Sequence, residues 1–246
     1  METHAHHLHK APGKKFWHFF FEFFMLFLAV FCGLLAENWR EHFVENKREK
    51  EYMQTMLEDL HSDTAEIQRQ ITLGMTMVTI ADSLIDILNH EDVIANTQMI
   101  YRLGFFRIVK AQLEDRTSSQ LKNAGGMRLI RNTKVAEELR EYWNVNKGLE
   151  NMTDRMEERA NASQLIGSQI FSNKYLIVRN KENPLEGFDV DPAARIVNND
   201  QHLLSQYSNL RFQHTMILRN YVRNLKFAKS AATELIQTIQ KEYDLK

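Results

Sequence analysis

The sequence predicts an all-α protein in which an N-terminal transmembrane helix continues into a stalk and an up-and-down bundle of about four long helices. Three observations support this fold class. The stretch from Phe16 to Ala36 is almost entirely apolar. Residues 16–89 contain two glycines and no proline, so nothing interrupts a long helix there. Beyond residue 53, apolar side chains recur alternately four and three residues apart, which is typical of packed helices.

The first 15 residues form a histidine-rich tail, in which four clustered histidines are followed by three lysines and a Pro-Gly pair. This composition allows a metal-binding tail or a disordered terminus with weak metal affinity. No partner ligands occur elsewhere in the chain, so we expect a disordered tail and predict no metal site. The four clustered histidines are His4, His6, His7 and His9.

Residues 16–36 are predicted to be a transmembrane helix. A helix needs about 20 residues to cross a bilayer, and this stretch contains 21, among them nine aromatic rings. The stretch is longer than an ordinary signal-peptide core and lacks a small-x-small cleavage pattern, which favours a retained anchor in the lipid bilayer over a signal peptide. Trp17 and Trp39 fit the aromatic belts that fix a helix at the two membrane interfaces.

The orientation of this helix follows less directly from the charges on either side of it. Three lysines precede the apolar stretch, and Arg40, Lys47, Arg48 and Lys50 follow it, so the basic residues are nearly balanced. We predict a single-pass protein of a bacterial inner membrane with its N-terminus in the cytoplasm and its C-terminal domain in the periplasm.

Residues 37–52 carry many charges of both signs and are predicted to form a juxtamembrane stalk helix, while residues 53–246 form a helical bundle domain. Additional apolar residues widen the heptad stripe beyond a two-stranded seam. This favours one helix of an intramolecular bundle over a free-standing coiled coil. The seam comprises Met53, Leu57, Leu60, Thr64, Ile67, Ile71, Gly74, Val78, Ala81, Ile85 and Leu88.

The remaining helices are predicted from start and stop signals. We expect helical segments at 93–109 and 118–121, the second ending at a glycine stop around Gly125. Asn132 is a predicted N-cap for a helix that extends to about Tyr175. Residues 180–199 hold two of the three prolines and are predicted to be an irregular connection. The last helix, 200–243, is long enough to run antiparallel to the first.

One face of the predicted transmembrane helix collects its polar and small residues. Counting back in sevens from the seam places Glu22 and Ala29 on the same stripe, although a straight helix drifts by about 20° per heptad. Small residues allow two helices to approach closely in lipid, so we predict a homo-oligomer assembled through this face. The predicted interface consists of Glu22, His18, Ala29, Cys32, Gly33 and Ala36.

Glu22 has three possible roles, because a carboxyl group at bilayer depth is unfavourable unless it is protonated, paired or hydrated. It can be hydrogen-bonded within the oligomer interface, as a buried polar residue that sets specificity. It can reach the headgroups, since only six residues precede it in the apolar stretch. It can also carry protons or ions together with His18, in a pore or against a second membrane subunit.

No catalytic motif is found in the sequence. Walker, GxSxG and dinucleotide-binding patterns are absent, and Glu58 with His61 is the one Glu-x-x-His pair, where a di-iron bundle needs two. Lys and Arg total 31 against 32 for Asp and Glu, so the net charge does not favour nucleic acid. We predict a non-enzymatic protein with no catalytic residues, no cofactor and no nucleic-acid partner.

The order of several motifs resembles a known family. Glu22 and Ala29 are followed by Asn38-Trp39, by a charged run ending in Lys50-Glu51-Tyr52, and by Ser119 to Ile130, SQLKNAGGMRLI. This arrangement is similar to an uncharacterised family of single-pass membrane proteins common in Bacteroidota, whose N-terminal membrane helix contains a glutamate and ends in Asn-Trp. The resemblance implies a membrane helix followed by a helical domain, and it implies no activity.

These features together favour a homo-oligomeric helical scaffold or sensor module anchored in the membrane. One alternative is an ion or proton channel, or an energy-coupling membrane subunit, that uses Glu22. The other is a ligand-sensing periplasmic bundle, which predicts a pocket between helices lined by polar groups.

Overall fold

The computed structural model describes residues 13–104, 109–123, 125–180, 182 and 187–245, with side chains from Trp17 onward. The predicted histidine-rich tail lies almost entirely outside these residues. The chain forms two compact units, Met1–Glu51 and Tyr52–Lys246. Within the described residues there are five α-helices, so the predicted all-α class is confirmed.

The first helix, α1, spans Gly13–His90 without interruption. It therefore contains the predicted transmembrane stretch, the predicted stalk and the first helix of the predicted bundle. In the first unit, Arg40 and Glu37 form an ion pair one turn apart on the exposed surface. The absence of proline and the rarity of glycine in this range account for the length of the helix.

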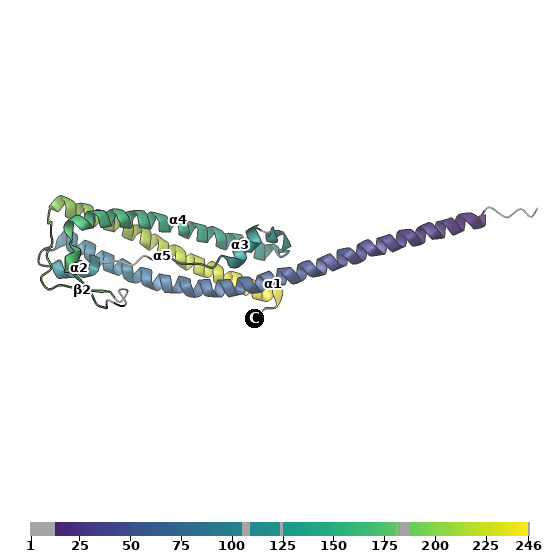
Figure 1. Ribbon diagram of the computed structural model, residues 1–246, viewed down its shortest axis with the longest axis horizontal. Coiled ribbons are helices and arrows are strands. Elements are labelled where there is room, and N and C mark those ends of the chain that lie inside the picture. The colour runs from purple at the N-terminus through teal and green to yellow at the C-terminus, as the bar shows by residue number, and fades with distance from the viewer. Residues whose placement is uncertain (1–12, 105–108, 124, 181, 183–186, 246) are drawn as a thin grey trace, which may run out of the picture. The chain divides into compact units, whose positions relative to one another are not determined.

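The second unit is built around three long helical segments (Figure 1). They are residues 52–90 of α1, α4 (Thr133–Ile170) and α5 (Gln201–Tyr243). Helix α5 runs antiparallel to α1, as predicted, because Lys229 bonds to Gln68 while Ser208 bonds to Asn89. Helix α4 runs in the same direction as α1. The predicted N-cap is confirmed, since the Asn132 side chain accepts a hydrogen bond from the Val135 amide.

The core consists of three consecutive apolar clusters along the second unit, each with residues from α1, α4 and α5. The predicted seam lies in this core. Thr64, Val78 and Ile85 are partly buried, and the other eight seam residues are buried. At Gly74 the helices approach so closely that a Cβ atom would lie 2.5 Å from Cγ2 of Val222.

Among the described residues between α1 and α4 there is no long helix, and residues 105–108 of the predicted 93–109 helix lie outside the described part of the chain. Where we predicted a helix over 93–109, the structure has the short α2 (Thr97–Gly104). Residues 109–115 then have no regular secondary structure and lead into α3 (Arg116–Asn123), which corresponds to the predicted segment at 118–121. Residues 109–117 are called the strap below. Gly125 has a positive φ of 65°, as its predicted role in a helix stop requires, and precedes the 3₁₀ helix η1 (Gly126–Leu129).

The strap makes the return pass that a fourth long helix was expected to make. Val109 lies beside Gly74, and the Thr117 amide bonds to Asp59, so the strap runs antiparallel to α1. An extended chain advances about 3.3 Å per residue and a helix about 1.5 Å, so the strap passes about 15 residues of α1 with only nine of its own. The bundle thus has three long helices and one mostly extended return segment.

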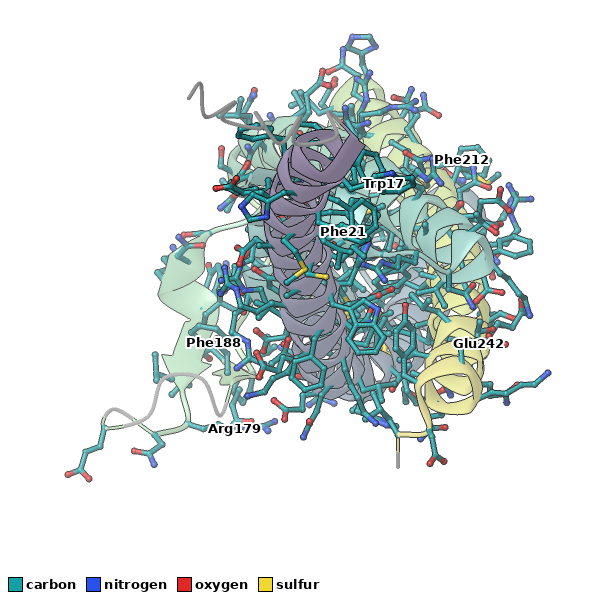
Figure 2. The ribbon with its side chains drawn as sticks, turned by 90° about the vertical axis from the view of Figure 1, so that its right-hand side faces the viewer. Trp17, Phe21, Arg179, Phe188, Phe212 and Glu242 are labelled. Atoms are coloured by element: carbon teal, nitrogen blue, oxygen red, sulfur yellow. The ribbon has the colours of Figure 1, made fainter. Side chains whose placement is uncertain are left out.

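Helix α4 ends at Ile170, five residues before the predicted position. The short 3₁₀ helix η2 (Asn173–Tyr175) follows, and then β1 (Leu176–Val178) pairs antiparallel with β2 (Phe188–Val190). The sequence analysis predicted an irregular connection at 180–199 and no strands. In Figure 2 the labelled Arg179 and Phe188 mark this small sheet, where Arg179 pairs with Asp189 at 2.8 Å.

Candidate functional site

The apolar stretch of α1 exposes nearly all of its side chains. Phe23 is 68% exposed, and the other aromatic residues from Trp17 to Phe31 are also exposed. Their contacts are with one another: Trp17 and Phe21 project from the same side of the helix in Figure 2, with ring centroids 6.1 Å apart. By length and composition this stretch could cross a membrane, and a signal sequence near the N-terminus would meet the same criterion.

The predicted interface residues are all exposed and lie on one continuous helix. Gly33 has open space where a Cβ would be placed, so the protein itself packs nothing against that position. Cys32 is exposed, and it is the one cysteine of the sequence. The predicted interfacial anchors Trp17 and Trp39 are exposed as well. The full interface set, Glu22, His18, Ala29, Cys32, Gly33 and Ala36, is therefore available to lipid or to another chain.

A different set of polar residues is buried in the second unit, on the face of α1 that meets the strap. Asp59 is 4% exposed and Asp63 is 2% exposed. The Glu114 amide donates to Asp63 Oδ1 at 2.7 Å, and the Thr117 amide donates to Asp59 Oδ2 at 3.0 Å. The amides of an extended segment have no acceptors within a helix. These carboxylates therefore accept the hydrogen bonds that the carbonyl groups of a neighbouring strand would otherwise accept.

The two aspartates differ in their surroundings. Arg116 donates to Asp59 at 2.7 Å, which gives that carboxylate a cationic partner. Asp63 instead accepts a hydrogen bond of 2.6 Å from the Tyr142 hydroxyl of α4, and it forms no ion pair with another described residue. Burial raises the pKa of Asp63 to about 6, against the opposing effect of its bonds to Tyr142 and to the Glu114 amide.

A cleft of about 800 Å³ lies between the strap, α3 and α4, with Tyr221 of α5 contributing to its wall. Trp143 lines it, donates from Nε1 to the Ser118 hydroxyl at 2.7 Å, and has the Lys122 ammonium 4.4 Å from its ring centre. The Asn146 side-chain oxygen is buried in this wall and has no hydrogen-bond partner within the described structure. The charged residues of the lining are Lys110, Glu114, Asp115, Lys122, Arg140, Lys147, Glu150 and Asp154.

A second buried polar group lies on α5. Arg211 is 1% exposed and His214 is 8% exposed. Burial, together with the smaller effect of the nearby Arg211 charge, lowers the pKa of His214 to about 4. Among the described residues, no group of three or more His, Cys, Asp or Glu side chains is arranged to hold a metal ion.

The sequence analysis did not identify Asp59, Asp63 or Tyr142. The two aspartates are four residues apart and flank the apolar seam, so they share one helix face, and this spacing was the available signal. On a helix with many charged residues, such spacing is usually a solvated surface. The predicted Glu22 face and this buried acidic face belong to different units and are described separately.

Comparisons of the chain with protein-family models, with curated proteins and with solved structures find no match. The arrangement of the residues is therefore the basis for the functional conclusions that follow.

Proposed function

We propose that this protein is a single-pass membrane protein whose helical domain is a non-enzymatic scaffold or sensor module, assembled as a homo-oligomer through the apolar part of α1. The observation that carries the proposal is the complete exposure of a long apolar helical stretch. Contact with water would be strongly unfavourable for so many large apolar side chains, whereas lipid or a second helix would cover them. The resemblance to the Bacteroidota membrane family supports the membrane helix and the helical domain, but no particular activity.

Membrane fractionation tests the anchor. The full-length chain is expected to remain in the membrane pellet after an alkaline carbonate wash and to be released by detergent. A chain lacking residues 16–36 is expected in the soluble fraction. Intact mass measurement of the membrane-bound protein distinguishes an anchor from a signal sequence: a product that begins after about residue 36 would refute a retained anchor.

The single cysteine provides a test of the assembly. Cys32 lies on the predicted interface, so mild oxidation of the protein in native membranes is expected to produce a disulfide-linked dimer. The matched control is Cys32→Ser combined with Phe27→Cys, which moves the thiol to the opposite face of the helix and should produce little dimer. Equal cross-linking from both positions would indicate random collision.

The role of Glu22 in this assembly is tested in the same experiment. Glu22→Leu is expected to change the yield of the Cys32 disulfide and the oligomer size in lipid nanodiscs, because a hydrogen-bonded carboxyl group inside the interface would be lost. Assembly identical to that of the wild type would remove Glu22 from the interface while leaving the anchor intact.

The cleft beside Trp143 supports ligand sensing as a second candidate function. Its lining combines four basic with four acidic side chains, among them Lys122 and Arg140 near Trp143 and Glu150 on α4. This distribution suits a small molecule that carries both an acidic and a basic group, such as an amino acid.

Fluorescence of Trp143 in a Trp17→Phe, Trp39→Phe background tests this second function. Titration with individual amino acids is expected to give a saturable change for at least one of them, and Glu150→Ala should weaken it. The control is Lys174→Ala, because Lys174 is an exposed residue on η2. A flat response to the whole panel would exclude amino acids as ligands.

A further inference from the structure

The strap is attached to the rest of the second unit mainly through its backbone amides. The Ala111 amide donates to the Tyr221 hydroxyl of α5 at 2.9 Å, and the Glu114 and Thr117 amides donate to the two buried aspartates of α1. Apolar contacts hold the first part of the strap, since Val109 belongs to the buried core and the partly buried Ala111 and Leu113 pack against it. Residues 114–116 are exposed, and this part of the strap is held by the amide bonds to the two aspartates and by the Arg116 pair with Asp59. Its position therefore depends on the state of the carboxyl groups that accept these bonds.

Of the two carboxyl groups, Asp63 is the one without a cationic partner among the described residues. A buried ionised carboxylate without a cation is unfavourable, whereas the neutral carboxylic acid keeps both of its hydrogen bonds. In the neutral form, Oδ1 still accepts from the Glu114 amide, and the protonated Oδ2 donates to the Tyr142 oxygen. The Tyr142 hydroxyl hydrogen then turns to the buried side-chain oxygen of Asn146, which has no other partner among the described residues. In the ionised form, hydration of Asp63 becomes favourable, and water can reach this carboxylate only when the strap moves away.

We propose that Asp63 is a proton-controlled latch: the neutral side chain holds the strap against α1, and loss of its proton allows the strap to open. Because five strap residues, Lys110, Ala111 and 113–115, line the cleft, opening also changes the wall of the cleft beside Trp143. The latch lies entirely within the second unit, and its opening requires neither the membrane anchor nor a bound ligand.

The groups that act on Asp63 come from every element around it. Asp59 on α1 and Glu114 on the strap repel its charge, while Tyr142 on α4 and the Glu114 amide stabilise it; Arg116 is bound to Asp59. The net result is that the pKa of Asp63 is raised to about 6 in the closed state, well above the ordinary range of an aspartate. The closed state therefore binds the proton more tightly than an open state with hydrated Asp63, so closure is favoured at low pH and weakens as the pH rises through about 6.

Hydrogen exchange of the full-length protein in lipid nanodiscs tests the latch. After correction for intrinsic exchange rates, the opening equilibrium of the amides in residues 112–117 is expected to increase about tenfold between pH 4.5 and 7.5. Amides in the middle of α4, at residues 150–160, provide the internal reference and should show no such change.

Three variants identify the group responsible. Asp63→Asn keeps an acceptor for the Glu114 amide and has no charge, so its strap should exchange at the same corrected rate throughout the pH range. Asp86→Asn is the matched control, an exposed aspartate on the same helix, and should retain the wild-type response. Tyr142→Phe removes a bond that favours the ionised form, so its transition should end at a higher pH.

A wild-type strap whose corrected exchange is constant from pH 4.5 to 7.5 would overturn the proposal, as would an unchanged response in Asp63→Asn. A purely structural role for Tyr142 would weaken the strap equally at every pH. If Asp63→Asn does not fold by circular dichroism, Tyr142→Phe decides the matter, because a transition at the wild-type pH would also refute the latch.

Discussion

The two parts of α1 have opposite surfaces. From Trp17 to Ala36 the helix exposes large apolar side chains and carries a single acid, Glu22, which is exposed too. From Met53 to Leu88 the helix buries its apolar side chains and also buries two aspartates. One uninterrupted helix therefore carries two different kinds of surface.

This contrast shows that the residue type alone does not decide which side chains of α1 are exposed. The elements that pack against each part of the helix decide it. In the first part, the described aromatic side chains contact one another along the same helix, and their exposure supports contact with lipid or with other chains. In the second part, α4 and α5 supply most of the partners, together with α2, α3 and the strap. The following predictions are ordered from the largest expected effect to the smallest.

The sharpest test of the contrast compares two leucines of α1. Leu60 is fully buried, so Leu60→Ala should lower the free energy of unfolding of the helical domain by about 3 kcal/mol through lost contacts and a cavity. Leu26 is 65% exposed, so Leu26→Ala should leave that free energy unchanged. Chemical denaturation in detergent, followed by Trp143 fluorescence in the Trp17→Phe, Trp39→Phe background, measures both. Equal losses would contradict the division of α1 into two environments.

Two aspartates of α1 provide a similar comparison for polar groups. Asp59→Ala should destabilise the domain by about 1–3 kcal/mol, because the buried Thr117 amide loses its acceptor. Asp86→Ala removes an exposed carboxylate and should have an effect within about 0.5 kcal/mol of zero. Urea unfolding curves of the two variants check this difference, and similar midpoints would show that the strap bond contributes little.

Gly74 tests how closely α1 and α5 must approach. Gly74→Ala should destabilise the domain by about 1 kcal/mol, since the overlap with Val222 outweighs the gain of about 1 kcal/mol in helix propensity. Adding Val222→Ala should recover most of the loss by making room. Gly33→Ala, in the exposed part of α1, meets no neighbouring atom and is the control. Thermal unfolding measures these differences, and a Gly74→Ala variant that unfolds at a higher temperature than the wild type would contradict the packing argument.

His214 gives the smallest effect and the opposite pH dependence to Asp63. Its pKa is lowered to about 4 in the folded state, so its contribution to stability is present above about pH 6.5 and is lost as the pH falls towards 4. His214→Gln should reduce the loss of stability between pH 7 and 5 by an amount on the order of 1 kcal/mol. Denaturation midpoints at the two pH values measure it, and identical pH profiles would exclude His214 as the cause.

Much of the fold could be predicted from local patterns. The heptad spacing identified the buried face of α1, Asn132 marked the start of α4, and the lack of helix breakers gave the length of α1. The strap was not predicted because residues 110–117, between the predicted helices 93–109 and 118–121, received no element, and no local pattern shows that their amides bond to acids on α1. The strands β1 and β2 were missed because each is only three residues long.

The sequence by itself determined the features that depend on neighbours along the chain: the helical class, the apolar stretch, the seam and the caps. Only the tertiary structure decided which acids are buried. The chain does not reveal from spacing alone that Asp63 faces Tyr142, 79 residues away, and the amide of Glu114. The physical reason is that apolar burial follows a repeating pattern, whereas a buried carboxyl group requires particular partners that folding brings together from distant segments.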